Sequence, residues 1–168
     1  MKELLQRVTP SVKGDRLELL LMVPQTETLI QDILKPITMV LRVEAILTKS
    51  ASQMRQILVA CITHADDHKG QWPENLQVLV EAQKLDAKLL HNPRRSQQTT
   101  GYTYIKPGAN WKKFPAARHI VLYENFDEWP QLHGAWIGLL DGHVERVDKK
   151  ERFEKMLAET QARNEEKP

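Results

Sequence analysis

Residues 40–69 read VLRVEAILTKSASQMRQILVACITHADDHK, and this stretch decides the fold. Apolar side chains recur in it at steps of three and four, the spacing that places them on one face of a helix. They are Val40, Val43, Leu47, Ala51, Met54, Leu58, Cys61 and Ala65. We therefore predict one long amphipathic helix over residues 28–69. Thr28 and Gln31 have capping-box spacing at its start, and Gly70 suits a left-handed stop at its end.

Pro36 interrupts the helical pattern near its start. Its ring clashes with the carbonyl of Asp32, and it has no amide hydrogen to donate. We predict a kink or a break at this position, with residues 28–35 as a separate helical piece in the harsher case.

A dense apolar run, residues 16–23, precedes the helix and follows Gly14-Asp15, a pair that favours a turn. We predict a strand here, with no strand partner evident between it and the helix. Two origins stay open: an edge strand of the domain's own sheet, or the end of an upstream domain. We accordingly divide the chain into an N-terminal extension (1–27), a main domain (28–160) and a disordered tail (161–168).

The apolar period changes from helical to alternating in the second half of the chain. Pro73 suits the first helical position of a short helix with Leu76, Leu79 and Val80 on its apolar face. Arg94 and Arg95 lie in a polar segment that we interpret as a solvated loop. An antiparallel meander of three or four strands is then predicted, from residues 102–105, 119–125, 135–140 and 143–147, with Asp141-Gly142 as a primed hairpin turn. A last helix is expected after an Asp148/Glu151 cap, with Phe153, Met156 and Leu157 inward.

The composition is that of a globular chain. It has 168 residues, of which 41% are hydrophobic, and a formal net charge of +2 with both signs scattered. This charge distribution argues against a nucleic-acid partner. The sequence contains no run of about 18 apolar residues, so we predict no membrane span. A long helix followed by an antiparallel meander predicts an α+β fold with the sheet packed on the helical stripe.

Four segments in this order carry a family resemblance: residues 52–57, 65–73, 102–108 and 139–145, the last reading LLDGHVE. They resemble the soluble part of type IV pilin-like and type II secretion pseudopilin-like proteins, of the kind found in planctomycetes. The resemblance implies a pilin-like fold, a non-enzymatic role in protein contacts of secretion or pilus machinery, and a location in the cell envelope.

The sequence departs from that family at its N-terminal end. The prepilin cleavage site and the hydrophobic half-helix of the family are not found here. Polar residues stand in their place before Pro36, namely Thr26, Glu27, Gln31, Asp32 and Lys35. Two expectations follow: a pilin-like module reused as a soluble domain, or the C-terminal piece of a larger protein.

Two sets of apolar residues are candidate contact surfaces for a protein partner or another copy of the chain. The first lies on the early part of the long helix: Ile30, Ile33, Leu34 and Ile37. The second consists of the loop tryptophans Trp111 and Trp129, which could alternatively stack on a glycan or another ligand.

A metal-binding domain, for Zn²⁺ or Ca²⁺ and with a hydrolytic role as one option, is the alternative interpretation. His64 and His68 are four residues apart, so they share a helix face, and Asp67 lies beside them. The competing interpretation is that these groups close the helix end. A second oxygen-rich segment contains Glu124, Asn125, Asp127 and Glu128, and Asp141 lies at the hairpin, where it also suits a turn. We predict no catalytic residue, because no nucleophile-base spacing, phosphate loop or CxxC pair is present. No cofactor is predicted beyond such a metal ion.

Overall fold

A computed structural model describes residues 8–13, 16–21, 26–95, 101–126, 128–130 and 133–165, and it describes side chains in these ranges from residue 37 onward. Contacts divide the chain into two compact units, Met1–Val43 and Glu44–Pro168. This division by contacts does not test the domain boundaries predicted at residues 27 and 160, which stay predictions.

The first unit contains a two-stranded antiparallel sheet. Strand β1 (Val8–Lys13) pairs with β2 (Arg16–Leu21), so that Val8 lies opposite Leu21 and Lys13 opposite Arg16. The strand predicted at residue 16 is confirmed, and its partner precedes it. The expectation of an edge strand in the main sheet is wrong, because β2 pairs with β1 in a separate sheet. Pro10 inside β1 obscured this strand, since proline cannot donate to a ladder and weakens a strand pattern.

Helix α1 (Thr26–Asp67) is the longest element. It runs without a break through Pro36, so the separate piece predicted over residues 28–35 is wrong. Pro36 removes one backbone hydrogen bond, but each residue added on either side contributes another, so the helix continues. The helix begins before Thr28, which is therefore not its cap. It ends at Asp67, two residues before the predicted end, and the left-handed stop predicted at Gly70 is confirmed: Gly70 has φ +87°, and its amide donates to the carbonyl of Ala65 at 2.7 Å.

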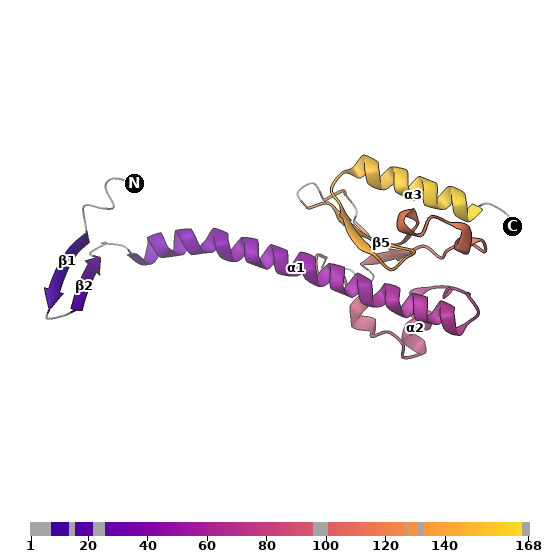
Figure 1. Ribbon diagram of the computed structural model, residues 1–168, viewed down its shortest axis with the longest axis horizontal. Coiled ribbons are helices and arrows are strands. Elements are labelled where there is room, and N and C mark those ends of the chain that lie inside the picture. Colours follow the sequence, from indigo (N-terminus) through magenta and orange to yellow (C-terminus); the bar gives the residue numbers. More distant parts are fainter. Residues whose placement is uncertain are drawn as a thin grey trace. The chain divides into compact units, whose positions relative to one another are not determined.

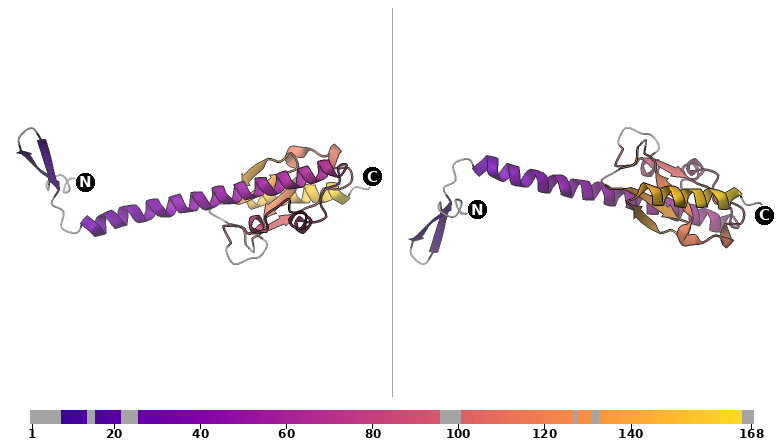
Figure 2. Two further views of the ribbon diagram at one scale, coloured as in Figure 1. Left: turned by 90° about the horizontal axis from the view of Figure 1, so that it is seen from below. Right: turned by 90° about the horizontal axis from the view of Figure 1, so that it is seen from above.

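The second unit is built on a four-stranded antiparallel sheet. Strands β3 (Tyr102–Tyr104), β4 (Ile120–Glu124), β5 (Ala135–Leu139) and β6 (Val144–Val147) lie in sequence order. Helix α3 (Lys150–Glu165) covers one face of the sheet, and the C-terminal half of α1 covers the other (Figures 1 and 2). The predicted α+β fold, a long helix with an antiparallel meander, is confirmed at this level.

Each face of the sheet has its own hydrophobic core. The core under α1 includes Met54, Leu58 and the fully buried Cys61, whose thiol pKa burial raises to about 12. The core under α3 joins Ile120, Ile137, Leu139 and Val147 to the helical residues Phe153, Met156 and Leu157. An irregularity in β4 shifts the register between Ile120 and Leu122. It explains why the consecutive residues Val121 and Leu122 both belong to the α1 core.

Short helical turns connect the main elements. Helix α2 (Leu76–Glu81) is capped by Asn75, whose Oδ1 accepts from the amide of Val78 at 3.2 Å. The first helical residue is thus Leu76, and the prediction that gave this place to Pro73 is wrong. The side chain of asparagine at the cap accepts from an amide of the first turn, which proline two residues earlier cannot do because its side chain has no acceptor. The described part of the unit also contains the 3₁₀ turns η2 (Ala87–Leu90), η3 (Trp111–Lys113) and η4 (Ala116–Arg118).

The β5–β6 hairpin does not use the primed turn predicted for Asp141-Gly142. Only Gly142 of the pair has a positive φ, +85°, and its amide donates to the carbonyl of Leu139 at 2.9 Å. A primed type I turn needs a positive φ at both central residues. The loop is instead Leu140–Gly142, of the three-residue kind that ends in a left-handed glycine. It places the Leu140 side chain in the α1 core.

Helix α3 is longer than the sequence suggested. It continues to Glu165, past Gln161 where we expected a disordered tail. Tertiary contacts hold this last part: Thr160 is fully buried and accepts from the amide of Ile120 at 3.0 Å, and Asn164 accepts from that of Gly108 at 2.8 Å. At the other end the helix begins at Lys150, and Asp148 pairs with Arg146 at 3.0 Å instead of serving as the predicted cap.

We expect the chain to lose stability below about pH 6.5 because of His119, which is fully buried against Phe114. Burial, and then the charge of Arg163, lowers the pKa of His119 from 6.5 to about 4. Between these values the unfolded chain binds a proton that the folded chain does not. The stability that neutral His119 contributes is therefore fully present above its unfolded pKa. It is lost as the pH falls toward 4, by up to about 1.4 kcal/mol per pH unit.

Urea unfolding of the wild type and of His119→Phe from pH 7 to pH 4.5 measures this effect. The variant keeps a ring against Phe114 and has no titrating group there, so its stability should fall less steeply. Equal slopes for the two proteins would show that His119 does not titrate differently in the folded and unfolded states.

Candidate functional site

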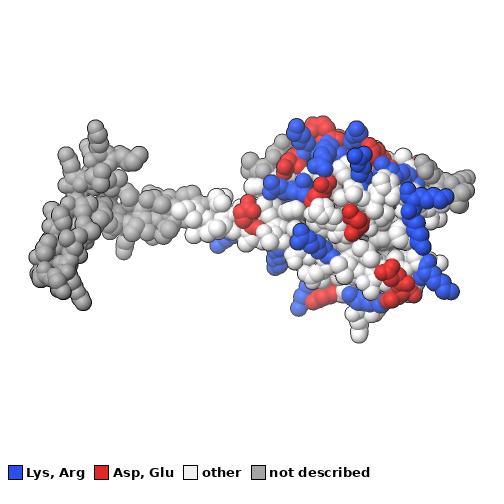
Figure 3. Space-filling view, viewed as in Figure 1, with Lys and Arg blue, Asp and Glu red and all other residues white. Residues whose placement is uncertain are grey.

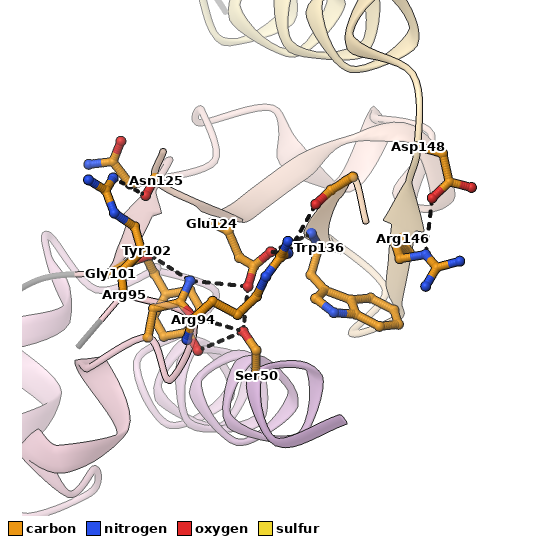
Figure 4. A network of polar contacts seen from close by, with 12 residues as sticks. Ser50, Arg94, Arg95, Gly101, Tyr102, Glu124, Asn125, Trp136, Arg146 and Asp148 are labelled. Atoms are coloured by element: carbon orange, nitrogen blue, oxygen red, sulfur yellow. Dashed lines mark hydrogen bonds and ion pairs between the residues drawn. The ribbon is translucent and has the colours of Figure 1, made fainter. Parts of the chain in front are cut away.

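A buried polar network joins α1 to the sheet, and Glu124 of β4 is its centre (Figure 4). The Glu124 side chain is 0% exposed. Its Oε1 accepts from Ser50 Oγ at 2.6 Å and from Asn92 Nδ2 at 3.1 Å. Its Oε2 accepts from Arg94 Nη1 at 2.6 Å and from the amide of Trp136 at 2.9 Å. Four donors from three parts of the unit, namely α1, the loop after η2 and β5, therefore satisfy the buried carboxylate, and Arg94 balances its charge.

The network extends from Glu124 to the neighbouring polar groups. Ser50 Oγ lies 3.1 Å from the Tyr102 hydroxyl, which donates to Gln53 Oε1 at 3.2 Å. Burial raises the pKa of Tyr102, so this hydroxyl keeps its proton. Arg94 also donates to the carbonyl of Gly134 at 3.0 Å. These contacts fix α1 against β3, β4 and the segment before β5.

The chemistry of this network is structural. Each oxygen of Glu124 already accepts two hydrogen bonds, so the carboxylate has little capacity left for a metal ion or a proton-transfer step. The interpretation that placed Glu124 in a calcium-binding loop is wrong for this residue, because both of its oxygens are already bonded within the fold. The solvated-loop interpretation of Arg94 is also wrong, because its side chain is 9% exposed and paired. One indication of this buried network was present in the sequence, which is the polar residue Ser50 beside the apolar stripe of the long helix.

His64 and His68 lie together at the end of α1, but not as metal ligands. Their rings are stacked, with centroids 3.9 Å apart and planes 14° from parallel. A metal ion must lie close to the plane of each imidazole that binds it, and two parallel stacked rings do not share such a point. His68 Nδ1 lies 2.7 Å from the carbonyl oxygen of His64. Burial, followed by the charges of His68 and Lys84, lowers the pKa of His64.

The other proposed metal ligands lie apart from one another. Asp67 pairs with Lys84 at 2.7 Å, and this hydrogen bond and charge lower the pKa of Asp67. Asp141 Oδ1 accepts from the amide of His143 at 2.9 Å and so forms the hairpin turn. Glu128 is exposed, and Asp127 lies outside the described residues. Within the described ranges, no three His, Cys, Asp or Glu side chains come together as metal ligands would.

The two loop tryptophans, Trp111 and Trp129, each make contacts within the fold. Trp111 is half-buried, donates from Nε1 to the carbonyl of Gly70 at 2.9 Å, and packs edge-on against the buried Trp72. Trp129 is also half-buried, and it donates to the carbonyl of Asp148 at 3.3 Å. Their role in partner or ligand contact stays a prediction.

Exposed apolar side chains gather on α1 at residues 37–41. Ile37 is 50% exposed, Met39 70%, Val40 62% and Leu41 64%. The side chains of Ile30, Ile33 and Leu34, predicted for the same surface, lie outside the described residues. No helix in the described part of the chain has an apolar stretch suited to crossing a membrane.

Comparisons with protein-family models, with curated proteins and with solved structures find no match to this chain.

Proposed function

We propose that this chain is a non-enzymatic, pilin-like interaction module of secretion or pilus-type machinery in the bacterial envelope. Its docking element is the early part of α1, which packs against the same helix of another pilin-like subunit. The observation that carries the proposal is the set of exposed apolar side chains Ile37, Met39, Val40 and Leu41, of which Ile37, Val40 and Leu41 share one face of the helix by their spacing. The assignment to secretion or pilus-type machinery rests on the sequence resemblance to pilin-like and pseudopilin-like proteins.

The exposed face is unlike ordinary surface apolar residues. Single exposed apolar side chains are common in proteins and need no explanation. Here four large ones fall within residues 37–41, each at least half exposed. A contiguous patch of this kind marks a contact surface, and on an amphipathic helix it suits packing against another helix.

The second unit holds the C-terminal half of α1 in its fold. The Glu124 network and the α1 core hold the C-terminal half of α1 to the sheet through Ser50, Gln53, Met54 and Leu58. A helix that is ordered before it binds has less conformational entropy to lose on docking. The network therefore supports binding without taking part in chemistry.

We expect the paired substitution Val40→Glu and Leu41→Glu to abolish self-association of the full chain. Two carboxylates in a helix-helix contact would be desolvated without partners, which would weaken the contact by about 100-fold or more. Sedimentation equilibrium over a range of protein concentrations measures this change.

The matched control is Val59→Glu, because Val59 is on the same helix and is 61% exposed. This control should associate like the wild type. A wild-type chain that stays monomeric at millimolar concentration, or equal losses in both variants, would contradict docking through residues 37–41.

A further inference from the structure

A groove of about 1100 Å³ lies where α1 ends. One wall is the segment Lys69–Glu74, and the other is the loop from Lys106 to Lys113 between β3 and β4. Asn164 of α3 fixes the loop, because it accepts from the amide of Gly108 at 2.8 Å and donates to the carbonyl of Lys106 at 3.3 Å. Trp111 ties the loop to the first wall through its bond to Gly70. The groove is thus preformed.

The groove carries an excess of positive charge. Four lysines line it, Lys69, Lys106, Lys112 and Lys113, together with one carboxylate, Glu74. Glu74 is already paired with Lys106. Within the described part of the chain, no carboxylate pairs with the other three lysines. Figure 3 shows basic side chains gathered at this end of the second unit, to the right in the view.

Aromatic and polar groups accompany the charges. The Trp111 ring lines the groove, and Lys112 Nζ lies 5.7 Å from its centroid. Trp72, 4% exposed, and His64 also line the groove. Trp72 Nε1 and His64 Nδ1 are buried and have no hydrogen-bond partner among the described residues. Buried polar atoms that the protein leaves unsatisfied call for an explanation, and a ligand in the groove with hydrogen-bonding groups would supply one.

We propose that this groove binds an acidic peptide segment of a partner protein. Carboxylates of the segment would pair with Lys69, Lys112 and Lys113, and an apolar side chain would pack on Trp111. The volume is larger than a single small anion needs and matches a ligand of several residues. Three uncompensated charges are too few for the continuous phosphate tracking of a nucleic-acid surface. This site is separate from residues 37–41, so its test is independent of the proposed function.

The test uses an acetylated peptide of about eight residues that alternates Glu and Ala, with the matching Lys and Ala peptide as a charge control. Calorimetric titration of the full chain should detect binding of the acidic peptide only, weakening as salt is added. The paired variant Lys112→Glu and Lys113→Glu should bind it about tenfold or more weakly, since two attractive pairs become repulsive.

A matched variant separates the groove from general charge. Lys149→Glu with Lys155→Glu makes the same change in net charge at two exposed positions near and on α3, and it should keep the wild-type affinity within about twofold. Equal losses in the two variants would overturn the proposal, as would no binding to the wild type at millimolar peptide. Binding of an oligogalacturonate but not of the peptide would also overturn it, in favour of an acidic glycan.

Discussion

Replacing Glu124 by Gln is expected to lower the free energy of unfolding by about 3–5 kcal/mol, the range for removing one partner of a buried ion pair. The substitution keeps the shape of the side chain but leaves the Arg94 guanidinium buried without a counter-charge. It also turns an amide NH₂ toward groups that donate, among them Ser50 and Asn92. Urea unfolding of the purified chain at pH 7 measures the loss.

The control for this prediction is Glu128→Gln, because Glu128 is exposed on the loop that follows β4. It should change stability by less than about 0.5 kcal/mol. Adding Arg94→Gln to Glu124→Gln should cost much less than the sum of the single losses, because the two side chains form one pair. Additive losses, or a Glu124→Gln variant as stable as the control, would show that the pair does not hold the unit together.

Gly134→Ala is expected to destabilise the second unit by at least about 3 kcal/mol. Gly134 has φ +54°, and a Cβ there would lie 2.2 Å from the carbonyl oxygen of Val147 and 2.7 Å from the Cα of Asp148. Both atoms belong to the backbone, so the end of β6 would have to move. That shift would also disturb the Gly134 carbonyl, which accepts from Arg94. Thermal and urea unfolding measure the effect.

Gly142→Ala is the matched control for the backbone clash. Gly142 also has a positive φ, +85°, but a Cβ there meets only the end of the Ile62 side chain, 3.2 Å away. Its cost should therefore be the conformational one alone, about 1–2 kcal/mol. Similar losses for the two variants would mean that the close contact at Val147 relaxes at little cost.

The regular elements of the second unit could be predicted because their apolar residues follow one period. Leu47, Ala51, Met54 and Leu58 of the helical stripe are all buried, and the four strands lie where alternation placed them. Such patterns report which face of an element meets the core. They do not report a partner strand, so the pairing of β2 with β1 could not be read from the sequence.

The buried network could not be predicted, because it depends on contacts between distant positions. Arg94 and Glu124 are 30 residues apart, and Ser50 and Glu124 are 74 apart. Each residue alone resembles an ordinary surface residue, and only the fold shows that the charges neutralise each other. For His64 and His68 the sequence suggested a site that the fold does not form. Their spacing suits a metal ion, but their rings stack on each other.

The central claim is that residues 37–41 of α1 contact the same helix of another subunit. A photo-crosslinking amino acid at position 40 tests it most directly, with the linked residues mapped by mass spectrometry in the full chain. The account predicts crosslinks between chains that map to the early part of α1. Crosslinks that map only within one chain, to the β1–β2 hairpin, would show that the chain covers this face itself and would contradict the claim.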